Sequence, residues 1–407
     1  MSAAERLATH LRLARTEGVG PVGYRKLLLD YGDAADALAA LPARARAAGR
    51  ARALRIPTPD EIAAEIDGTT ALGGRILILG DPDYPPLLAA IHDAPPALSV
   101  LGDPARLHGC AVGIVGARNA SSNGARMAES LAATLAAQGI TIISGMARGI
   151  DAAAHRGALR AGATIAAVAG GLDRPYPSEH AELQSLIARH GAVVTETPLG
   201  VAPQTRHFPR RNRLIAGLAQ GCVVVEAALR SGSLITAELA TLYGRTVFAV
   251  PGSPLDPRCR GSNALLRHGA VLTESEHDVL AELPEERRGE RIGAGAAAPR
   301  PGRPGDLAQH QAPWPAPPPA EAAGRAPAID ADTPEDAGEI RRAVLSLLSF
   351  TPTPVDDLVR RCQFSTSAIL TVLSELELAG NIETLPGGSV VLPSLPPAGR
   401  PDLEREA

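Results

Sequence analysis

Between residues 75 and 283, short runs of β-branched and apolar residues alternate with amphipathic stretches, and this alternation constrains the fold more than any other feature. The intervening stretches, such as 123–138 and 150–161, carry apolar residues at helical spacing. A repeated order of strand, turn and helix predicts an α/β fold, a Rossmann-like doubly wound parallel sheet covered by helices. The predicted strands are residues 76–79, 111–115, 141–143, 164–168, 193–195, 222–226, 246–250 and 271–273.

The flanking segments predict two smaller modules and a linker. Residues 1–70 predict helices around the turn Gly18-Val19-Gly20, which suits either a helix-hairpin-helix (SAM-like) region that faces a DNA phosphate or a plain helical bundle. Residues 338–395 predict three short helices and a hairpin, the order of a winged helix. The segment 284–337 is dominated by Pro, Ala and Gly, and we expect a disordered linker there.

Charge and residue usage exclude several classes of protein. No apolar run approaches the roughly 20 residues of a membrane span, and no leader pattern opens the chain, so we expect a cytoplasmic protein with a formal net charge of −4. Lys26 is the only lysine, and its neighbours do not form the GxxxxGK[ST] loop of an ATPase. The four cysteines are too dispersed for a disulfide framework or a metal clasp, and we expect neither metal nor cofactor. They are Cys110, Cys222, Cys259 and Cys362.

The loops that follow the predicted strands carry the candidate binding residues. Doubly wound folds hold ligands outside the carboxyl ends of their strands, where small residues offer free amides and arginines offer forked phosphate donors. The loop after residues 111–115 departs from G-x-G-x-x-G, and no acidic residue follows 141–143 for a ribose hydroxyl, which excludes a dinucleotide oxidoreductase. The candidate nucleic-acid-binding residues are Gly116, Ala117, Arg118, Ser144, Gly145, Arg148, Gly149, Arg206, Phe208, Arg211, Asn212, Arg213, Gly232 and Ser233.

Residues 206–213 are the sharpest local feature, with four arginines and Phe208 within a weakly acidic chain. Arginine clamps on the backbone beside an aromatic platform for a base are typical of single-stranded nucleic-acid binding. For Arg211 and Arg213 individually, pairing with an internal carboxylate that braces the loops is an alternative. The candidate carboxylates are Asp151, Asp173 and Glu226.

Candidate catalytic residues are few. His155 follows Asp151 by one helical turn and could form an acid–base pair with it, although a structural role on the helix explains the same spacing. Residues 231–238 loosely resemble the Gly-rich motif of nucleotide phosphoribohydrolases, with Glu238 as the carboxylate, but lack its Pro-Gly-Gly opening. We therefore expect no enzyme, and the alternative is a nucleotide-binding Rossmann hydrolase.

Four ordered motifs are similar to those of the DNA-processing protein A (DprA/Smf) family. They are Val-Gly-Ala-Arg at 115–118, Ser-Gly-Met-Ala-Arg-Gly-Ile-Asp at 144–151, Phe-Pro-Arg-Arg-Asn-Arg at 208–213 and Ser-Gly-Ser-Leu-Ile-Thr-Ala at 231–237. The resemblance covers about residues 79–283, and the flanking modules follow the family's order of parts.

This resemblance implies a protein of natural transformation that binds incoming single-stranded DNA, protects it and loads the RecA recombinase onto it. It implies a homodimer formed through the Rossmann domain, without enzymatic activity. By position, it assigns Arg118 and Phe208 to the pocket that holds the strand, surrounded by the glycine turns at Gly116, Gly145 and Gly149.

The predicted winged helix has the wrong charge for reading a duplex. A recognition helix needs cations or hydrogen-bonding side chains for phosphates and base edges. Residues 363–391 contain no Lys or Arg, whereas Glu375, Glu377 and Glu383 are acidic. We expect this module to contact protein, or simply to dock.

Overall fold

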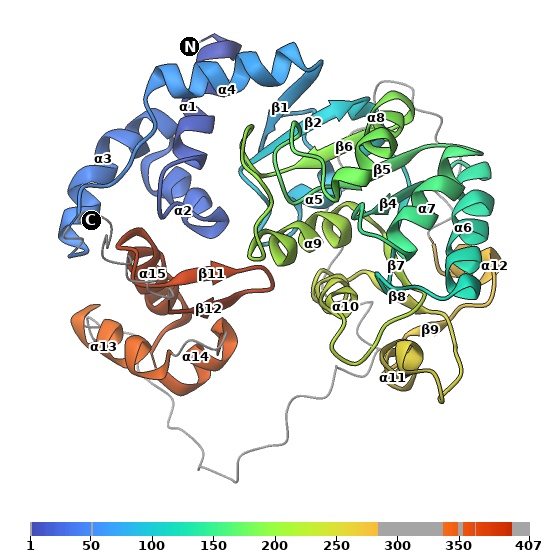
Figure 1. The fold of residues 1–407 in the computed structure, drawn as a ribbon. Coiled ribbons are helices and arrows are strands. Elements are labelled where there is room, and N and C mark those ends of the chain that lie inside the picture. Colours follow the sequence, from blue (N-terminus) through green and yellow to red (C-terminus); the bar gives the residue numbers. More distant parts are fainter. Residues whose placement is uncertain (1, 50–51, 284–336, 349–352, 363, 393–407) are drawn as a thin grey trace, which may run out of the picture. The chain divides into compact units, whose positions relative to one another are not determined.

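The structure is a computed structural model that describes residues 2–49, 52–283, 337–348, 353–362 and 364–392. The chain divides into two compact units. Unit 1 comprises residues 1–12 and 57–329, and unit 2 comprises residues 13–56 and 330–407. Figure 1 shows the elements of both.

The described part of unit 1 is built on a nine-stranded sheet in the order β1-β2-β6-β5-β4-β3-β7-β8-β9. All pairs from β6 to β9 are parallel, whereas β2 is antiparallel to both β1 and β6. The strands are β1 (Gly74–Ile78), β2 (Ala97–Gly102), β3 (Ala111–Val115), β4 (Thr141–Ser144), β5 (Thr164–Ala167), β6 (Ala192–Thr195), β7 (Gly221–Val224), β8 (Thr246–Ala249) and β9 (Val271–Leu272).

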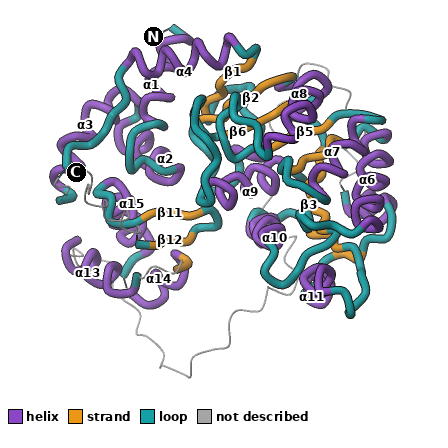
Figure 2. Tube along the Cα trace, in the orientation of Figure 1, coloured by secondary structure: helices purple, strands orange, loops and turns teal. Residues whose placement is uncertain are grey.

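Helices cover both faces of this sheet (Figures 1 and 2). One face packs against α6, α7, α8 and α12, and the other against α5, α9, α10 and α11. The helices are α1 (Ala3–Ala14, which continues into unit 2), α4 (Pro59–Ala71), α5 (Pro86–Ala89), α6 (Ser122–Ala137), α7 (Ile150–Leu159), α8 (Ala181–His190), α9 (His207–Leu218), α10 (Gly232–Leu242), α11 (Arg260–Arg267) and α12 (Glu276–Glu282). Short 3-10 turns lie at Pro104–Leu107, Ser178–His180 and Pro257–Cys259.

The central strands are buried along their whole length. Every residue of β3, β4, β5, β6 and β7 is buried, as expected for a parallel sheet covered on both faces. This explains why continuous β-branched runs, rather than alternating ones, marked these strands in the sequence.

The predicted fold class is confirmed, with one strand that the sequence pattern did not reveal. Residues 97–102 form β2, directly after Pro95-Pro96, and carry the small residues Ala97 and Ser99 between the larger apolar ones. This strand turns one end of the sheet antiparallel, so the sheet is mixed rather than wholly parallel.

Unit 2 joins the beginning and the end of the chain. Its helices are α2 (Pro21–Tyr31), α3 (Ala34–Ala47), α13 (Ala337–Leu347), α14 (Val355–Cys362) and α15 (Thr366–Leu378). Strands β10 (Thr353–Pro354), β11 (Glu383–Leu385) and β12 (Ser389–Val391) form a small antiparallel sheet in the order β10-β12-β11. Helices α13 to α15 and this sheet share one apolar core and complete the predicted winged helix.

The last turn of α15 packs on the turn that precedes α2. Leu378 is buried in the same apolar cluster as Val19, Tyr24 and Leu27. Gly18 has φ +76°, and a Cβ there would lie 2.9 Å from the carbonyl oxygen of Glu377. A Cβ on Gly20 would lie 2.6 Å from the Glu377 carboxylate. The turn between α1 and α2 and the winged helix therefore pack together within unit 2.

Two polar contacts support this packing. The Lys26 ammonium donates to the Thr371 hydroxyl at 3.2 Å, and Arg341 donates to the carbonyl of Ala48 at 2.7 Å. None of the described helices in either unit is long and apolar enough to cross a membrane. The predicted linker 284–337 lies outside the described residues except for Ala337, and the predicted domain limits at 70, 75, 283, 338 and 395 stay predictions.

Candidate nucleic-acid interface

The strand order gathers the predicted residues at one edge of the sheet. Chain order reverses between β3 and β7, which lie side by side in parallel. In doubly wound folds the ligand crevice lies at this reversal, outside the carboxyl ends of the strands. The segments that follow β3, β4, β5, β6 and β7 all leave the sheet at this edge, and those after β3, β4, β6 and β7 carry most of the candidates.

An arginine and two aromatic rings meet there. The Arg118 guanidinium, on an exposed residue after β3, lies over the Phe208 ring at 5.2 Å from its centroid. Phe208 is half-buried in the first turn of α9, and its ring meets that of Tyr176 edge-on, with centroids 5.5 Å apart. Such contacts fix the orientation of each group. Tyr176 was missed because a single tyrosine between two prolines has no periodic signal.

Arg211 lies beneath this cluster rather than on the surface. It is 5% exposed, donates to the carbonyl of Ala167 at 3.2 Å and approaches the Asp151 carboxylate at 3.9 Å. Burial raises the pKa of Asp151, against the opposing influence of Arg211 and of backbone amides. A Cβ on Gly145 would collide with the Arg211 guanidinium at 1.3 Å, so Gly145 leaves the space that this arginine fills.

Arg213 is also buried and paired, with partners that the sequence did not indicate. Its guanidinium donates to the carbonyl of Asp93 at 2.6 Å and forms an ion pair with Glu196. The Asp93 carboxylate lies 3.7 Å from the same guanidinium and accepts a hydrogen bond from the Tyr243 hydroxyl at 2.8 Å. For both Arg211 and Arg213, the structure shows the internal pairing that the sequence had left open.

Two further glycines bring the first two loops together. A Cβ on Gly116 would lie 2.6 Å from the Ile150 side chain. Gly149 has φ +72°, and a Cβ there would lie 2.3 Å from the carbonyl oxygen of Ala117. The amide of Ile150 donates to that same carbonyl at 3.2 Å. These glycines allow the close approach that places Arg118 beside the start of α7.

The two other candidate arginines, Arg148 and Arg206, are exposed. Arg148 is exposed and forks onto Glu179 with two contacts of 2.7 Å, which keeps the pKa of Glu179 below its usual range. Arg206 is exposed immediately before α9. Ser144 is buried, and its hydroxyl donates to the carbonyl of Ile114 at 2.6 Å, so it ties β4 to β3.

The remaining candidates connect α9 to α10. The Asn212 side chain is buried and donates to the carbonyl of Gly232 at 3.2 Å. Ser231 caps α10, and its hydroxyl contacts that of Ser233 at 2.7 Å. These side chains hold the helix starts at the sheet edge.

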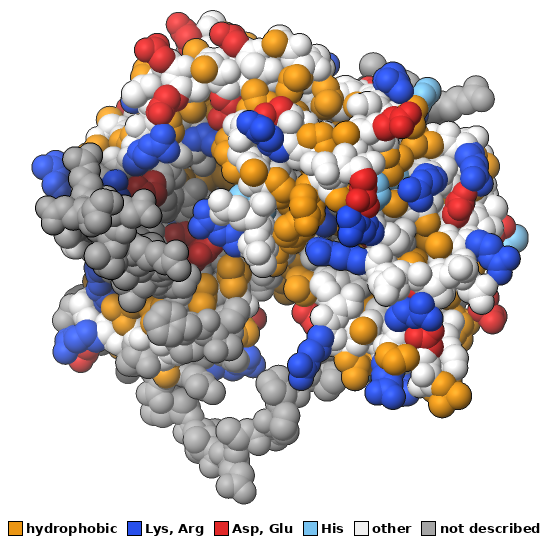
Figure 3. Space-filling model, viewed as in Figure 1, with side chains coloured by type: hydrophobic (Ala, Val, Ile, Leu, Met, Phe, Trp, Pro, Cys, Tyr) orange, Lys and Arg blue, Asp and Glu red, His pale blue; other side chains and the backbone are white. Residues whose placement is uncertain are grey.

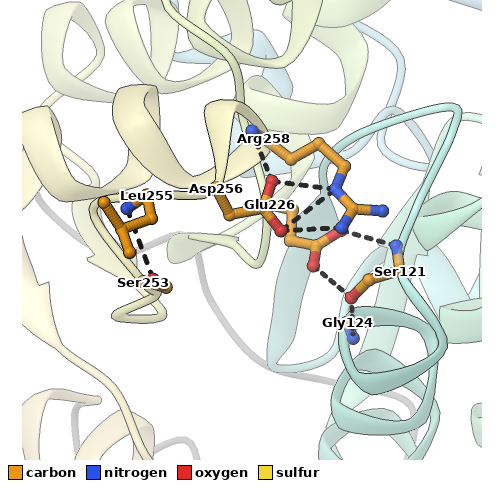
Figure 4. A network of polar contacts seen from close by, with 7 residues as sticks. All are labelled: Ser121, Gly124, Glu226, Ser253, Leu255, Asp256 and Arg258. Carbon is orange, nitrogen blue, oxygen red and sulfur yellow. Dashed lines mark hydrogen bonds and ion pairs between the residues drawn. The ribbon is translucent and has the colours of Figure 1, made fainter.

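A carboxylate occupies the amino terminus of α6, the first helix after β3 (Figure 4). Glu226 is 6% exposed and accepts from the Ser121 amide at 2.9 Å and from the Ser121 hydroxyl at 2.5 Å. The same hydroxyl caps the helix by accepting from the amide of Gly124 at 2.9 Å. Because helix amino termini attract anions, this is where a doubly wound protein would hold a nucleotide phosphate.

The possible catalytic residues do not combine into a pair. His155 is completely buried, and its Nδ1 lies 2.8 Å from the Thr164 hydroxyl. Burial lowers the pKa of His155 to about 3, so the ring is neutral at physiological pH. Asp151 instead contacts the amide of Ala147 at 3.3 Å and the guanidinium of Arg211. Glu238 is exposed on α10.

The face of the molecule drawn in Figure 3 carries local rather than continuous positive charge. On the face drawn in Figure 3, basic side chains are interspersed with acidic and hydrophobic ones and do not merge into one band. Residues 110–283 contain 16 Arg against 13 Asp and Glu, which gives the same picture. An anionic ligand would depend here on a few placed guanidinium groups.

Comparison with known protein families identifies the family to which this chain is related. The family described as DNA recombination-mediator protein A matches residues 75–284. The chain belongs to the DNA-processing protein A (DprA/Smf) family. The flanking modules match a DprA-like N-terminal HHH domain at residues 3–68 and a DprA winged helix domain at residues 315–388. The resemblance that the motifs indicated is confirmed.

Relatives and a solved structure agree with this assignment. Protein Smf of Escherichia coli is 38% identical over 313 residues, which cover 76% of this chain and 75% of that protein. DNA processing protein DprA of Bacillus subtilis is 41% identical over 215 residues, 52% of this chain and 72% of that protein. The crystal structure of DNA processing protein A from Streptococcus pneumoniae matches with a TM-score of 0.58 and 36% identity, covering 70% of this chain and 99% of that one.

Proposed function

We propose that this protein binds single-stranded DNA at the carboxyl edge of the unit 1 sheet. The observation that carries the proposal is the exposed Arg118 guanidinium, held over the Phe208 ring and next to Tyr176. A guanidinium can fork onto a phosphate while a neighbouring ring stacks on a base, which is how single strands are held without sequence preference. The names of the relatives, which describe DNA processing, support the same class of ligand.

Within this proposal the buried arginines have a structural role. Arg211 and Arg213 are each paired with carboxylates inside the protein, so they brace the segments that carry Phe208. Arg118, Arg148 and Arg206 are exposed at or near the same edge and are the groups that reach the DNA backbone. Gly116, Gly145 and Gly149 provide the close packing on which this arrangement depends.

The cellular role that we propose is recombination mediation during natural transformation. The protein protects incoming DNA and loads the RecA recombinase onto it, as a cytoplasmic homodimer without enzymatic activity. Family membership supports this role. The exposed edge strand β9, in which Leu272 is 50% exposed, offers a surface for association with a second copy.

The alternative, a phosphoribohydrolase-like enzyme, has less support. Glu226 already occupies the amino terminus of α6, so a nucleotide phosphate would have to displace a bound carboxylate. His155 is buried and neutral, and it does not pair with Asp151. Incubation with nucleoside monophosphates should therefore release no base above background. Release that depends on Glu238 would support the enzyme instead.

Direct binding measurements test the main proposal. Affinity for a labelled oligothymidine should be measured by fluorescence anisotropy across a salt series. We expect binding with a shallow salt dependence, because only a handful of phosphates are neutralised. A slope corresponding to about ten phosphates per protomer would contradict this site. Loading is tested by whether the protein accelerates single-strand-dependent ATP hydrolysis by RecA on DNA already coated with a single-strand-binding protein.

A further inference from the structure

Tyr176 is an exposed aromatic residue that lies next to the proposed strand pocket. It stands between β5 and α8, at the same sheet edge as Arg118, and is 49% exposed. Its ring contacts Phe208, with centroids 5.5 Å apart and planes inclined by 64°. This edge-on arrangement leaves much of the Tyr176 surface open to solvent.

The Phe208 ring is less available than its neighbour. The Arg118 guanidinium lies 5.2 Å from its centroid and that of Arg211 lies 6.0 Å away. Phe208 is also half-buried, in the first turn of α9. A base that stacked on Phe208 would compete with these cations for the ring, whereas the Tyr176 ring carries no guanidinium among the described contacts.

Protein contacts alone do not explain a tyrosine at this position. Its hydroxyl has no hydrogen-bond partner within the described part of the chain, and its ring meets that of Phe208 edge-on. A leucine would pack against Phe208 as an apolar neighbour. The features that a leucine would not supply are a flat exposed face and a π-system.

The charges around Tyr176 suit a strand that passes over it. Arg148 lies within electrostatic reach of Tyr176 and is exposed. Arg118 lies on the other ring of the aromatic pair. Two exposed guanidinium groups near one open ring can hold the phosphates that flank a stacked base, with a phosphate taking the place of the Glu179 carboxylate on Arg148.

We propose that Tyr176 provides the open face on which a base of the bound single strand stacks, while Phe208 positions the Tyr176 ring and the Arg118 guanidinium. This rests on the proposed single-strand binding and specifies the group that contacts the base. The ligand is any nucleobase of a single strand, because every base presents a π-face and no hydrogen-bonding edge is read.

The test compares two protein variants on two ligands. Tyr176→Leu removes the ring and keeps apolar volume, whereas Tyr176→Phe keeps the ring and removes only the hydroxyl. The ligands are a labelled oligothymidine and an oligomer of the same length and charge made of abasic nucleotides. Thermal unfolding of all variants checks that the fold is intact.

We expect the wild type and Tyr176→Phe to prefer the intact oligomer to the abasic one by roughly tenfold or more, a difference typical of one stacked base. Tyr176→Leu should bind both oligomers equally, at the level of the wild type on the abasic strand. If Tyr176→Leu keeps the full preference, the proposal is wrong; loss of that preference in Phe208→Leu with Arg118 intact would then assign the stacking to Phe208.

A fluorescence measurement reports stacking independently of affinity. Trp314 is the only tryptophan of the chain, so Tyr176→Trp in a Trp314→Phe background carries one probe at the site. Quenching by oligothymidine, but not by the abasic strand, is expected for a stacked base. Binding without any change in fluorescence would overturn the inference but leave single-strand binding itself established. A wild type that binds neither oligomer would instead overturn the proposed function.

Discussion

The sheet edge of unit 1 and helix α15 of unit 2 both have shapes that bind nucleic acid in other proteins, yet they differ in charge and in access. At the sheet edge, exposed Arg118 and Arg148 flank aromatic rings. Helix α15 stands where a winged helix carries its recognition helix. Residues 363–391 there hold no cation, and Leu378 is buried against the chain's own hairpin.

This difference shows that a fold shared with nucleic-acid-binding proteins does not by itself provide nucleic-acid binding. Function is set by the side chains that reach solvent and by what already covers them. The sequence predicts that the acidic winged helix contacts protein or simply docks, and in the structure the end of α15 packs beside α2, with Glu377 against Gly20. The predictions below test whether nucleic-acid contact in this protein belongs to the sheet edge alone.

The largest effect is expected from Arg213→Ala. Removing this guanidinium takes the paired cation away from the buried Asp93 carboxylate and the half-buried Glu196 carboxylate, which should cost about 3–5 kcal/mol of the unfolding free energy. Urea unfolding of Arg213→Ala and of the control Arg206→Ala measures it, since Arg206 is exposed and its loss should leave the midpoint unchanged. If Arg213→Ala kept normal stability but lost affinity for DNA, Arg213 would bind DNA rather than stabilise the fold.

Arg118→Ala should affect binding rather than stability. A forked, charge-assisted contact to a phosphate contributes about 2 kcal/mol, so affinity for oligothymidine should fall roughly 30-fold, with the melting temperature nearly unchanged. The salt slope should fall by about one phosphate. Arg267→Ala on α11 removes the same charge from another exposed surface and serves as the control. Equal losses in both variants would show that general charge, not a placed guanidinium, drives binding.

Acid should weaken unit 1 through His155. Burial holds the His155 ring neutral with a pKa of about 3, whereas the unfolded chain gains a proton near pH 6.5. The unfolded state therefore binds more protons between these values, and this contribution to stability is present above pH 6.5 and lost progressively as pH falls toward 3. Arg211 and His180 also disfavour the charged ring.

The variant His155→Gln should show a flatter fall in melting temperature between pH 6.5 and 4, because an amide can still contact Thr164 but does not titrate. Unit 2 provides the internal comparison, since neither of its segments, 13–56 or 330–407, contains a histidine. An unchanged pH profile in His155→Gln would assign the acid sensitivity of unit 1 to its carboxylates.

The smallest effect on DNA affinity is expected from deleting residues 284–407. The deletion removes the acidic winged helix and leaves the sheet edge whole, so single-strand affinity should fall by about 1 kcal/mol or less. Anisotropy with oligothymidine on the full and shortened chains measures this. Complete loss of binding would show that the winged helix, and not the sheet edge of unit 1, is the main DNA site.

Sequence reasoning reached the fold because buried parallel strands carry continuous β-branched runs, as in β3 and β7. It missed β2, whose residues follow two prolines and pair antiparallel. Residues 206–213 were interpreted as a loop, but they form the start of α9. That helical start places Phe208 and Arg211 one turn apart, so both contact the same cluster.

The division of the arginines into exposed and buried ones could not be predicted from sequence. Arg213 pairs with Asp93, which lies 120 positions earlier in the chain, and only the tertiary fold brings them together. Arg118 was assigned from its place after a strand, a signal that is local and therefore visible. Tyr176 stands between Pro175 and Pro177 and belongs to no periodic pattern that could mark it.

The burial of Leu378 among side chains of the first helices also determines the order in which the two units can fold during synthesis. The segment 13–56 leaves the ribosome first, but the residue that closes its apolar cluster is made more than 300 positions later. At roughly 5–20 residues per second, the hairpin waits on the order of tens of seconds, during which the whole of unit 1 emerges and can fold. The segment that is synthesised first is thus among the last to complete its apolar core. A chain truncated before residue 378 contains the whole sheet of unit 1 but lacks Leu378, which closes the apolar cluster of residues 13–56.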